Sequence, residues 1–242
     1  MLATWEVLGF SLLPALGILV GSLLAETIRT PSWAVGASLH ATAGIAIALV
    51  SIDVMPRLMV ASPMWVIVCS FFVGACISLM LAGIFGSFRV RPGRGSVSAL
   101  MVYVAVATDL TSDGLMVGAG TAMGKQLGFL LAATQSIGNI PGGFATTSNF
   151  RNDGMPRLLR MSLLASIMVP APICAVLGFI LLRDTGGMLQ SVTLSIFMGV
   201  LLLATIEDIV PEGDEPEPPR WISTAAFAGG FGLFALLSNT LK

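Results

Sequence analysis

Long apolar stretches separated by short polar connections run along the whole chain. A helix needs about 20 apolar residues to cross a bilayer, and by that measure the sequence predicts eight membrane-spanning helices. They cover residues 6–27, 33–55, 63–86, 97–121, 126–149, 158–183, 188–210 and 220–240. The connections contain turn formers such as Pro31, Gly93 and Gly186. We therefore expect an all-α polytopic membrane protein.

The composition agrees with this pattern and narrows the function. Of 242 residues, 55% are hydrophobic and 10% are charged, and the mean hydropathy is +0.92, which no soluble domain of this size needs. A formal net charge of −1 argues against nucleic acid as a partner. The three cysteines lie in apolar runs, which predicts small core residues and neither a disulfide framework nor a zinc knot. The N-terminal stretch lacks the basic start of a signal peptide, so we treat it as the first helix.

The basic residues indicate an orientation. Cytoplasmic loops carry an excess of Lys and Arg. With the N-terminus outside, the inside connections hold twice as many Lys and Arg as the outside ones. The inside residues are Arg29, Arg89, Arg91, Arg94, Arg151, Arg157, Arg160 and Arg220. We expect a bacterial cytoplasmic membrane with both termini outside.

A short phrase recurs at the ends of the second and seventh predicted helices. The sequence reads Asp53-Val-Met-Pro56 in the second and Asp208-Ile-Val-Pro211 in the seventh. Two helices five apart run in opposite directions, so the phrases would lie on opposite faces of the membrane. This predicts an inverted repeat, a common plan of transporters. One transporter domain, 1–242, would contain repeat one (1–88), a central hairpin (97–149) and repeat two (158–242).

Two carboxylates lie inside the fourth predicted helix. A charge at the centre of a bilayer costs roughly 2.5–3.5 kcal/mol on insertion scales, so Asp109 and Asp113 are functional candidates. They are four residues apart and share one helix face. Across the hairpin, Asn139 and Gln135 precede Pro141, which removes a helix hydrogen bond. We expect a broken helix that faces an acidic one and holds a cation.

Other polar residues have two interpretations each. His40, the single histidine, is either a metal ligand on the pathway or a core residue with a hydrogen-bond partner. Asp53 is a candidate entrance acid, and Glu207 and Asp208 are candidate exit acids. All three are otherwise acids solvated at a helix end. In the hairpin, Asn139 could instead satisfy backbone groups near Pro141, and Gln135 could join two helices.

These phrases, in this order, resemble the ZIP (Zrt/Irt-like) metal-ion transporters along nearly the whole chain. The frame Asp109-Leu-Thr-Ser-Asp113-Gly is similar to the family's fourth-helix motif His-Asn-x-x-(Asp/Glu)-Gly. The frame Gly138-Asn139-Ile-Pro141 is similar to the fifth-helix motif (His/Gln)-(Asn/Asp)-x-Pro. The acid-apolar-apolar-Pro phrases at Asp53 and Asp208 also fit. The resemblance implies eight helices in a 3+2+3 arrangement, a binuclear metal site between helices four and five, and metal uptake into the cytoplasm.

The chain departs from the family at most ligand positions. Asp109 replaces a histidine and Leu110 an asparagine, while Gly138 and Gly142 replace fifth-helix ligands. The sixth-helix glutamate of the family falls near Ala171. Zn²⁺ favours nitrogen and sulfur ligands, whereas carboxylate and amide oxygens suit harder ions such as Mn²⁺. We expect weaker zinc binding than in a typical family member and a relative gain for harder ions.

Together these observations predict a ZIP-like transporter of divalent metal ions (Zn, Mn or Fe). The metal-site candidates are Asp109, Asp113, Asn139, His40 and Gln135. The alternative is a degenerate ZIP-fold protein that passes another small solute or serves as a membrane partner. The chain lacks a Walker A loop, and one histidine cannot form a His-Glu-x-x-His site, so we expect no enzyme and no organic cofactor. The expected partners are metal ions and membrane lipid, and homodimer formation is left open.

Overall fold

The structure is a computed structural model that describes residues 4–28, 32–88, 95–152, 154–214 and 217–240. These residues form helices joined by short connections and contain no strand, which confirms the all-α fold class. Four arginines used to orient the chain, at positions 29, 89, 91 and 94, lie outside the described residues.

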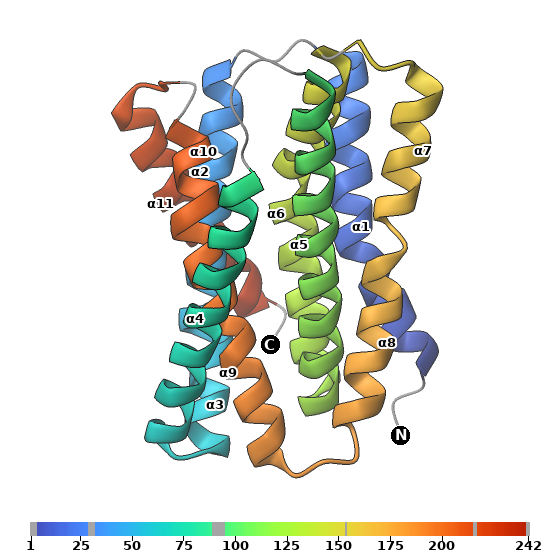
Figure 1. Cartoon of the computed structure of the whole chain (residues 1–242). Helices are drawn as coiled ribbons and strands as arrows, with labels where there is room; N and C mark the ends of the chain where they lie inside the picture. The colour runs from blue at the N-terminus through green and yellow to red at the C-terminus, as the bar shows by residue number, and fades with distance from the viewer. Residues whose placement is uncertain (1–3, 29–31, 89–94, 153, 215–216, 241–242) are drawn as a thin grey trace.

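Two groups of helices stand side by side (Figure 1). The group that contains the predicted central hairpin is here named the hairpin bundle. It consists of α1 (Thr4–Thr27), α5 (Gly95–Met123), α6 (Lys125–Asn152), α7 (Arg157–Ile167) and α8 (Pro170–Leu182). The other group, the frame bundle, consists of α2 (Ser32–Ala48), η1 (Leu49–Val54), α3 (Met55–Ala61), α4 (Met64–Phe88), α9 (Gly187–Ala204), η2 (Thr205–Ile209), α10 (Val210–Asp214) and α11 (Arg220–Thr240).

Each predicted membrane segment coincides with a helix or with helices placed end to end. The second comprises α2 and η1, and α3 extends it beyond the predicted end at residue 55. The sixth comprises α7 and α8, which are separated just before Pro170. Proline lacks a backbone donor and commonly begins a helix, which explains this break. Six of the described helical segments are long and apolar enough to cross a membrane, as in an integral membrane protein. The more polar α5 and α6 are not among them, so eight crossings stay a prediction.

Glycines bring the helices of the hairpin bundle into backbone contact. A Cβ added at Gly17 of α1 would stand 1.9 Å from the Ser136 carbonyl oxygen of α6. A Cβ added at Gly114 of α5 would stand 2.3 Å from the Ala171 carbonyl oxygen of α8. Small residues at such crossings let backbones approach closely. The backbones of α1 and α6, and those of α5 and α8, are therefore packed closely against each other.

The frame bundle uses the same device. A Cβ at Gly44 of α2 would stand 2.1 Å from the Phe227 carbonyl oxygen of α11. A Cβ at Gly199 of α9 would stand 2.2 Å from the Phe71 carbonyl oxygen of α4. The two tightest pairs here are thus α2–α11 and α4–α9.

Side chains, rather than backbones, fill the boundary between the bundles. The largest apolar cluster spans it and includes Leu49 and Leu194 from the frame bundle and Met116 and Leu131 from the hairpin bundle. Among the described glycines, Gly138 alone faces the other bundle, and the nearest atom to an added Cβ is a Thr42 methyl at 3.3 Å. The boundary is therefore looser than the contacts inside either bundle.

The two helices that carry the acid-x-x-Pro phrase share an unusual backbone. Both contain a π-helical segment, η1 and η2, and each segment ends two residues before a proline, Pro56 and Pro211 respectively. Asp53 lies in η1 and Asp208 lies in η2. Short π segments inside α-helices often occur at functional sites. The phrase in the sequence therefore marks the same backbone feature twice.

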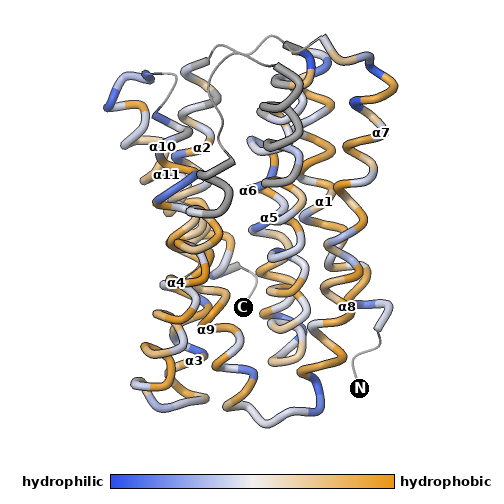
Figure 2. The backbone as a smooth tube through the Cα atoms, viewed as in Figure 1, coloured by the Kyte–Doolittle hydropathy of each residue, from blue (hydrophilic) through white to orange (hydrophobic). Residues whose placement is uncertain are grey.

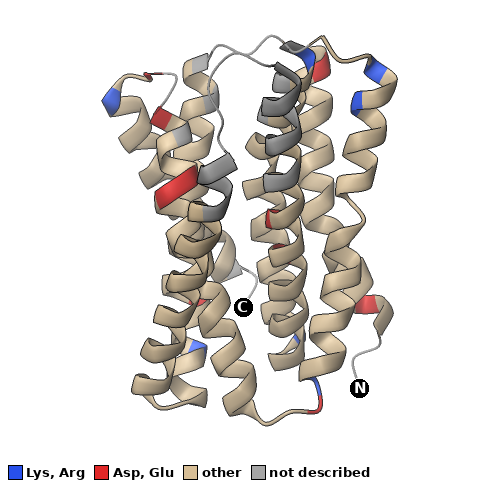
Figure 3. Cartoon of the chain, in the orientation of Figure 1, with Lys and Arg blue, Asp and Glu red and all other residues tan. Residues whose placement is uncertain are grey.

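Hydropathy and charge differ between the outer helices and the central hairpin. Apolar residues dominate the outer helices α4, α8 and α9, whereas α5 and α6 contain more polar positions (Figure 2). Most Lys and Arg lie near the helix ends, while acidic residues also occur part-way along α5 and near the α9–α10 junction (Figure 3). These acids lead to the candidate site.

Candidate cation site between α5 and α6

The centre of the candidate site is a carboxylate–amide contact across the α5–α6 hairpin. Asp113 of α5 is only 5% exposed. The Asn139 side-chain amide donates to Asp113 Oδ2 at 2.7 Å, and its nitrogen also lies 3.4 Å from the Pro14 carbonyl oxygen of α1. A buried carboxylate is costly unless it is hydrogen-bonded. The amide donor thus occupies a place where a cation would also be stabilised.

Packing against α1 places Asn139 at this position. A Cβ added at Gly143 would stand 2.1 Å from the Ile18 carbonyl oxygen, so α6 lies directly on α1 beside the site. The helix continues through Pro141 from Lys125 to Asn152. The expectation of a broken helix at Pro141 is therefore wrong. The proline removes one hydrogen bond, and close packing of the turns around it keeps the helix continuous.

A second and a third carboxylate interact with this contact or with each other. Asp109, one turn before Asp113, is exposed and interacts electrostatically with it. It also interacts electrostatically with Asp208 of η2, in the other bundle. Like charges repel one another. A bound cation or proton would relieve this repulsion, and the predicted exit acid Asp208 therefore belongs to the same electrostatic group as the hairpin acids.

Gln135 forms a second contact across the hairpin, one turn from Asn139. Its amide nitrogen donates to the Met116 sulfur at 3.4 Å. Gln135 is 6% exposed, and its Oε1 atom is buried with no hydrogen-bond partner among the described residues. Asp113 and Met116 are three residues apart on α5, and Gln135 and Asn139 are four apart on α6, so the two contacts lie one above the other.

The remaining predicted residues lie apart from this pair. His40 Nε2 is 3.2 Å from Asp214 of α10, and His40 Nδ1 donates to the Gly36 carbonyl oxygen at 2.9 Å. His40 is therefore a core residue with hydrogen-bond partners, as one of its two interpretations predicted. The structure does not bring its imidazole to Asp109 or Asp113. Asp53 is buried in η1, and Glu207 is exposed in η2.

No group of three His, Cys, Asp or Glu side chains among the described residues is close enough to hold a metal ion. In this structure the Asn139 amide nitrogen faces the Asp113 carboxylate. A cation bound there would need the amide to rotate, so that its oxygen faces the cation instead. Sequence reasoning missed two neighbours, the Pro14 carbonyl and the Met116 sulfur. The position of Met116, three residues after Asp113, was the available signal for the sulfur.

Comparison with family models and with curated proteins gives no match for this chain. The functional argument therefore depends on the site itself.

Proposed function

We propose that the chain moves divalent metal ions (Zn, Mn or Fe) across the cytoplasmic membrane through the α5–α6 site. The observation that carries the proposal is the buried Asp113–Asn139 contact with Asp109 and Asp208 in electrostatic range. An ionisable residue deep in a membrane bundle is costly and is by default a functional group. Carboxylate and amide oxygens are ligands for hard and borderline divalent ions.

An inverted repeat of three helices on each side of the hairpin supports a transporter. Under this repeat α2 corresponds to α9 and α4 to α11. The close contacts agree, because α2 packs on α11 as α9 packs on α4. The pairs Gly44 and Gly199, Asp53 and Asp208, and Pro56 and Pro211 are each separated by the same number of residues. With α5 and α6 as two further crossings, this plan has eight spans in a 3+2+3 arrangement.

The two bundles supply a way to open the site. Backbone contacts lock helices within each bundle, whereas side chains fill the boundary between them. Asp113 and Asn139 both belong to the hairpin bundle, and Asp208 belongs to the frame bundle. A shift of one bundle against the other changes the distance from Asp208 to Asp109. Such a movement opens the site to one side of the membrane and closes it to the other.

The resemblance to ZIP transporters favours the same function, and the ligand changes define its selectivity. The site is rich in oxygen and has no histidine, because His40 is engaged by Asp214. We therefore propose that zinc binds less tightly than in a typical ZIP transporter and that harder ions such as Mn²⁺ gain relative to it. The Irving–Williams order still places Zn²⁺ above Mn²⁺ in absolute affinity.

One observation favours the second candidate, a degenerate ZIP-fold protein that passes another solute or acts as a membrane partner. No three side chains of the types His, Cys, Asp and Glu converge in the described part of the chain. If the Asp113–Asn139 contact never opens, it is a structural hydrogen bond. The two candidates differ in whether Asp113 meets a metal ion during turnover.

The test is metal uptake into liposomes that contain the purified protein and a trapped fluorescent chelator. Zn²⁺, Mn²⁺ and Fe²⁺ are supplied outside to the wild type and to Asp113→Asn. We expect the substitution to reduce uptake by at least about tenfold, because loss of even an outer partner of a metal ligand typically costs about 10–100-fold in affinity or activity. The matched control is Asp184→Asn, which removes a charge from the exposed Arg183–Asp184 pair and leaves uptake unchanged.

Two results would contradict the proposal. Folded wild-type protein that carries none of the three ions would exclude metal transport and favour the second candidate. Equal uptake by wild type and Asp113→Asn would show that the ion passes elsewhere.

A further inference from the structure

The Met116–Gln135 contact combines a sulfur atom and an amide inside the bundle, next to the Asp113–Asn139 contact. Both side chains are buried, with Met116 at 5% and Gln135 at 6% exposure. Met116 also lines a small apolar cavity of about 10 Å³ with Met198 and Leu131. A thioether is a weak hydrogen-bond acceptor, so Met116 is a poor partner for an amide.

The hydrogen bonds of Gln135 are incomplete. Its amide nitrogen is 3.4 Å from the sulfur, and its oxygen has no donor among the described residues. An unsatisfied buried amide oxygen costs about 1–3 kcal/mol. Rotation of the amide by 180° would bring Oε1 beside the sulfur and would lose only the weak N–H···S contact. After this rotation the amide oxygen and the sulfur both offer lone pairs. They would repel a ligand that carries lone pairs of its own, and they suit a ligand that accepts electron pairs.

We propose that Met116 Sδ and Gln135 Oε1 form a second cation position, one helix turn from the Asp113–Asn139 contact. This inference rests on the proposed transport function and adds a selectivity step to it. A cation fits because both atoms offer electron pairs and the oxygen lacks a partner. The two positions follow each other along the α5–α6 interface, so an ion that leaves Asp113 toward the α5–α6 turn meets Met116 next.

The two positions differ in chemical hardness. The first offers carboxylate and amide oxygens, which hold hard ions. The second includes a thioether, which soft and borderline transition-metal ions accept and which Mg²⁺ and Ca²⁺ do not favour. The second position therefore favours soft and borderline ions such as Cd²⁺ and Zn²⁺ over hard ions such as Mg²⁺, Ca²⁺ and Mn²⁺ after both have entered. This assigns the substrate class as borderline divalent transition-metal ions.

The test compares a soft ion, Cd²⁺, with a hard ion, Mn²⁺, by equilibrium binding to the purified full-length protein. Cys69, Cys76 and Cys174 are first replaced by serine, because free thiols bind Cd²⁺. In that background, Met116→Leu removes the sulfur and nearly conserves the side-chain volume, an exchange that cores tolerate well. We expect Cd²⁺ affinity to fall about tenfold, the lower end for losing a group at a metal site, with Mn²⁺ affinity unchanged.

The matched control is Met198→Leu, because Met198 lines the same cavity while Gln135 donates to Met116. It should leave both affinities unchanged. X-ray absorption of the Cd²⁺-loaded cysteine-free protein should show a sulfur neighbour that disappears in Met116→Leu, which separates loss of a ligand from a change in folding.

The outcomes separate this inference from the proposed function. An unchanged Cd²⁺-to-Mn²⁺ ratio in Met116→Leu, or a cadmium spectrum without sulfur, overturns the second position. Asp113→Asn is measured in the same way and should weaken the binding of both Cd²⁺ and Mn²⁺. If Asp113→Asn binds both ions as the wild type does, the transport site itself fails, whatever Met116 shows.

Discussion

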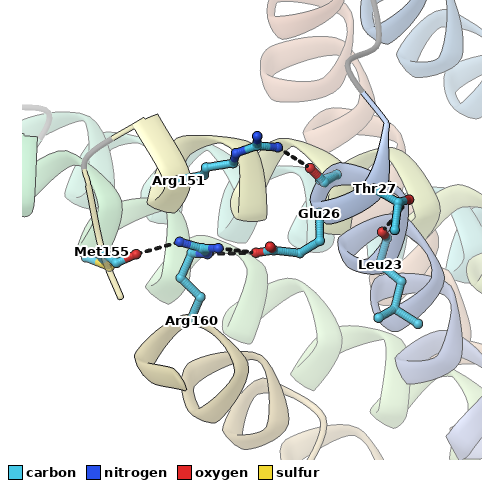
Figure 4. Close-up of polar contacts among 7 residues, drawn as sticks. Leu23, Glu26, Thr27, Arg151, Met155 and Arg160 are labelled. Atoms are coloured by element: carbon cyan, nitrogen blue, oxygen red, sulfur yellow. Dashed lines mark hydrogen bonds and ion pairs between the residues drawn. The ribbon is translucent and has the colours of Figure 1, made fainter. Parts of the chain in front are cut away.

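A buried ion pair joins α1 to the start of α7 and allows a quantitative prediction. Arg160 donates to Glu26 Oε1 from Nε at 2.7 Å and from a terminal nitrogen at 2.6 Å (Figure 4). Its other terminal nitrogen donates to the Met155 carbonyl oxygen at 2.5 Å. Both side chains of the pair are 10% exposed. The perturbation is Glu26→Gln, which keeps the shape and removes the charge.

The magnitude follows from the burial of the remaining charge. Two unit charges about 4 Å apart interact by about 4 kcal/mol at an effective dielectric constant near 20. Removing one partner of a buried pair typically costs about 3–5 kcal/mol, because the other charge is left uncompensated. For a chain of this size that loss lowers the melting temperature by roughly 6 to 20 °C.

The assay is thermal denaturation of the purified protein in detergent, with Glu6→Gln as the matched control. Glu6 also lies on α1 and pairs with Lys125, whose side chain is 58% exposed, so its loss should cost no more than about 1 kcal/mol. A Glu26→Gln protein that melts within a degree or two of the Glu6→Gln protein would refute the reasoning, and would mean that water reaches Arg160.

Two further predictions concern helix contacts. Gly44→Ala should destabilise the protein by about 1–3 kcal/mol, because its Cβ meets the Phe227 carbonyl, whereas Gly9→Ala, with nothing within 4 Å, should stabilise it by about 0.5–1 kcal/mol. Equal melting temperatures for the two variants would contradict the close packing. His40→Gln should speed hydrogen exchange of the α10 amides by releasing Asp214. Unchanged exchange would show that the Gly36–Gly213 contact holds α10 alone.

The helices and one contact of the site were predictable from the sequence for simple reasons. Apolar runs long enough for a membrane leave few alternatives to helices, so the described helices match the predicted ranges. A short connection between α5 and α6 forces the two helices side by side. Asp113 and Asn139, at similar depths from that connection, are in contact for this reason. Their role as ligands stays a prediction.

Other features depend on packing that local patterns do not encode. The partner of His40 is Asp214, which is distant in the chain and is placed by the contact of Gly36 with Gly213. The π segments change the backbone hydrogen bonds and leave the hydropathy unaltered, so only the repeated acid and proline indicated their positions. Pro141 illustrates the opposite error, because the local rule predicts a break and packing against α1 keeps the helix continuous.

The glycine contacts have a consequence for tracing the ancestry of this chain. A larger side chain forces the backbones apart where a carbonyl oxygen lies about 2 Å from the place of a Cβ, as at Gly17, Gly44, Gly114 and Gly199. Polar residues outside these contacts are free of this steric restriction. We therefore expect relatives of this chain to keep glycine at these four positions. Distant relatives of this chain can therefore be recognised by the spacing of these glycines more than by the polar motifs.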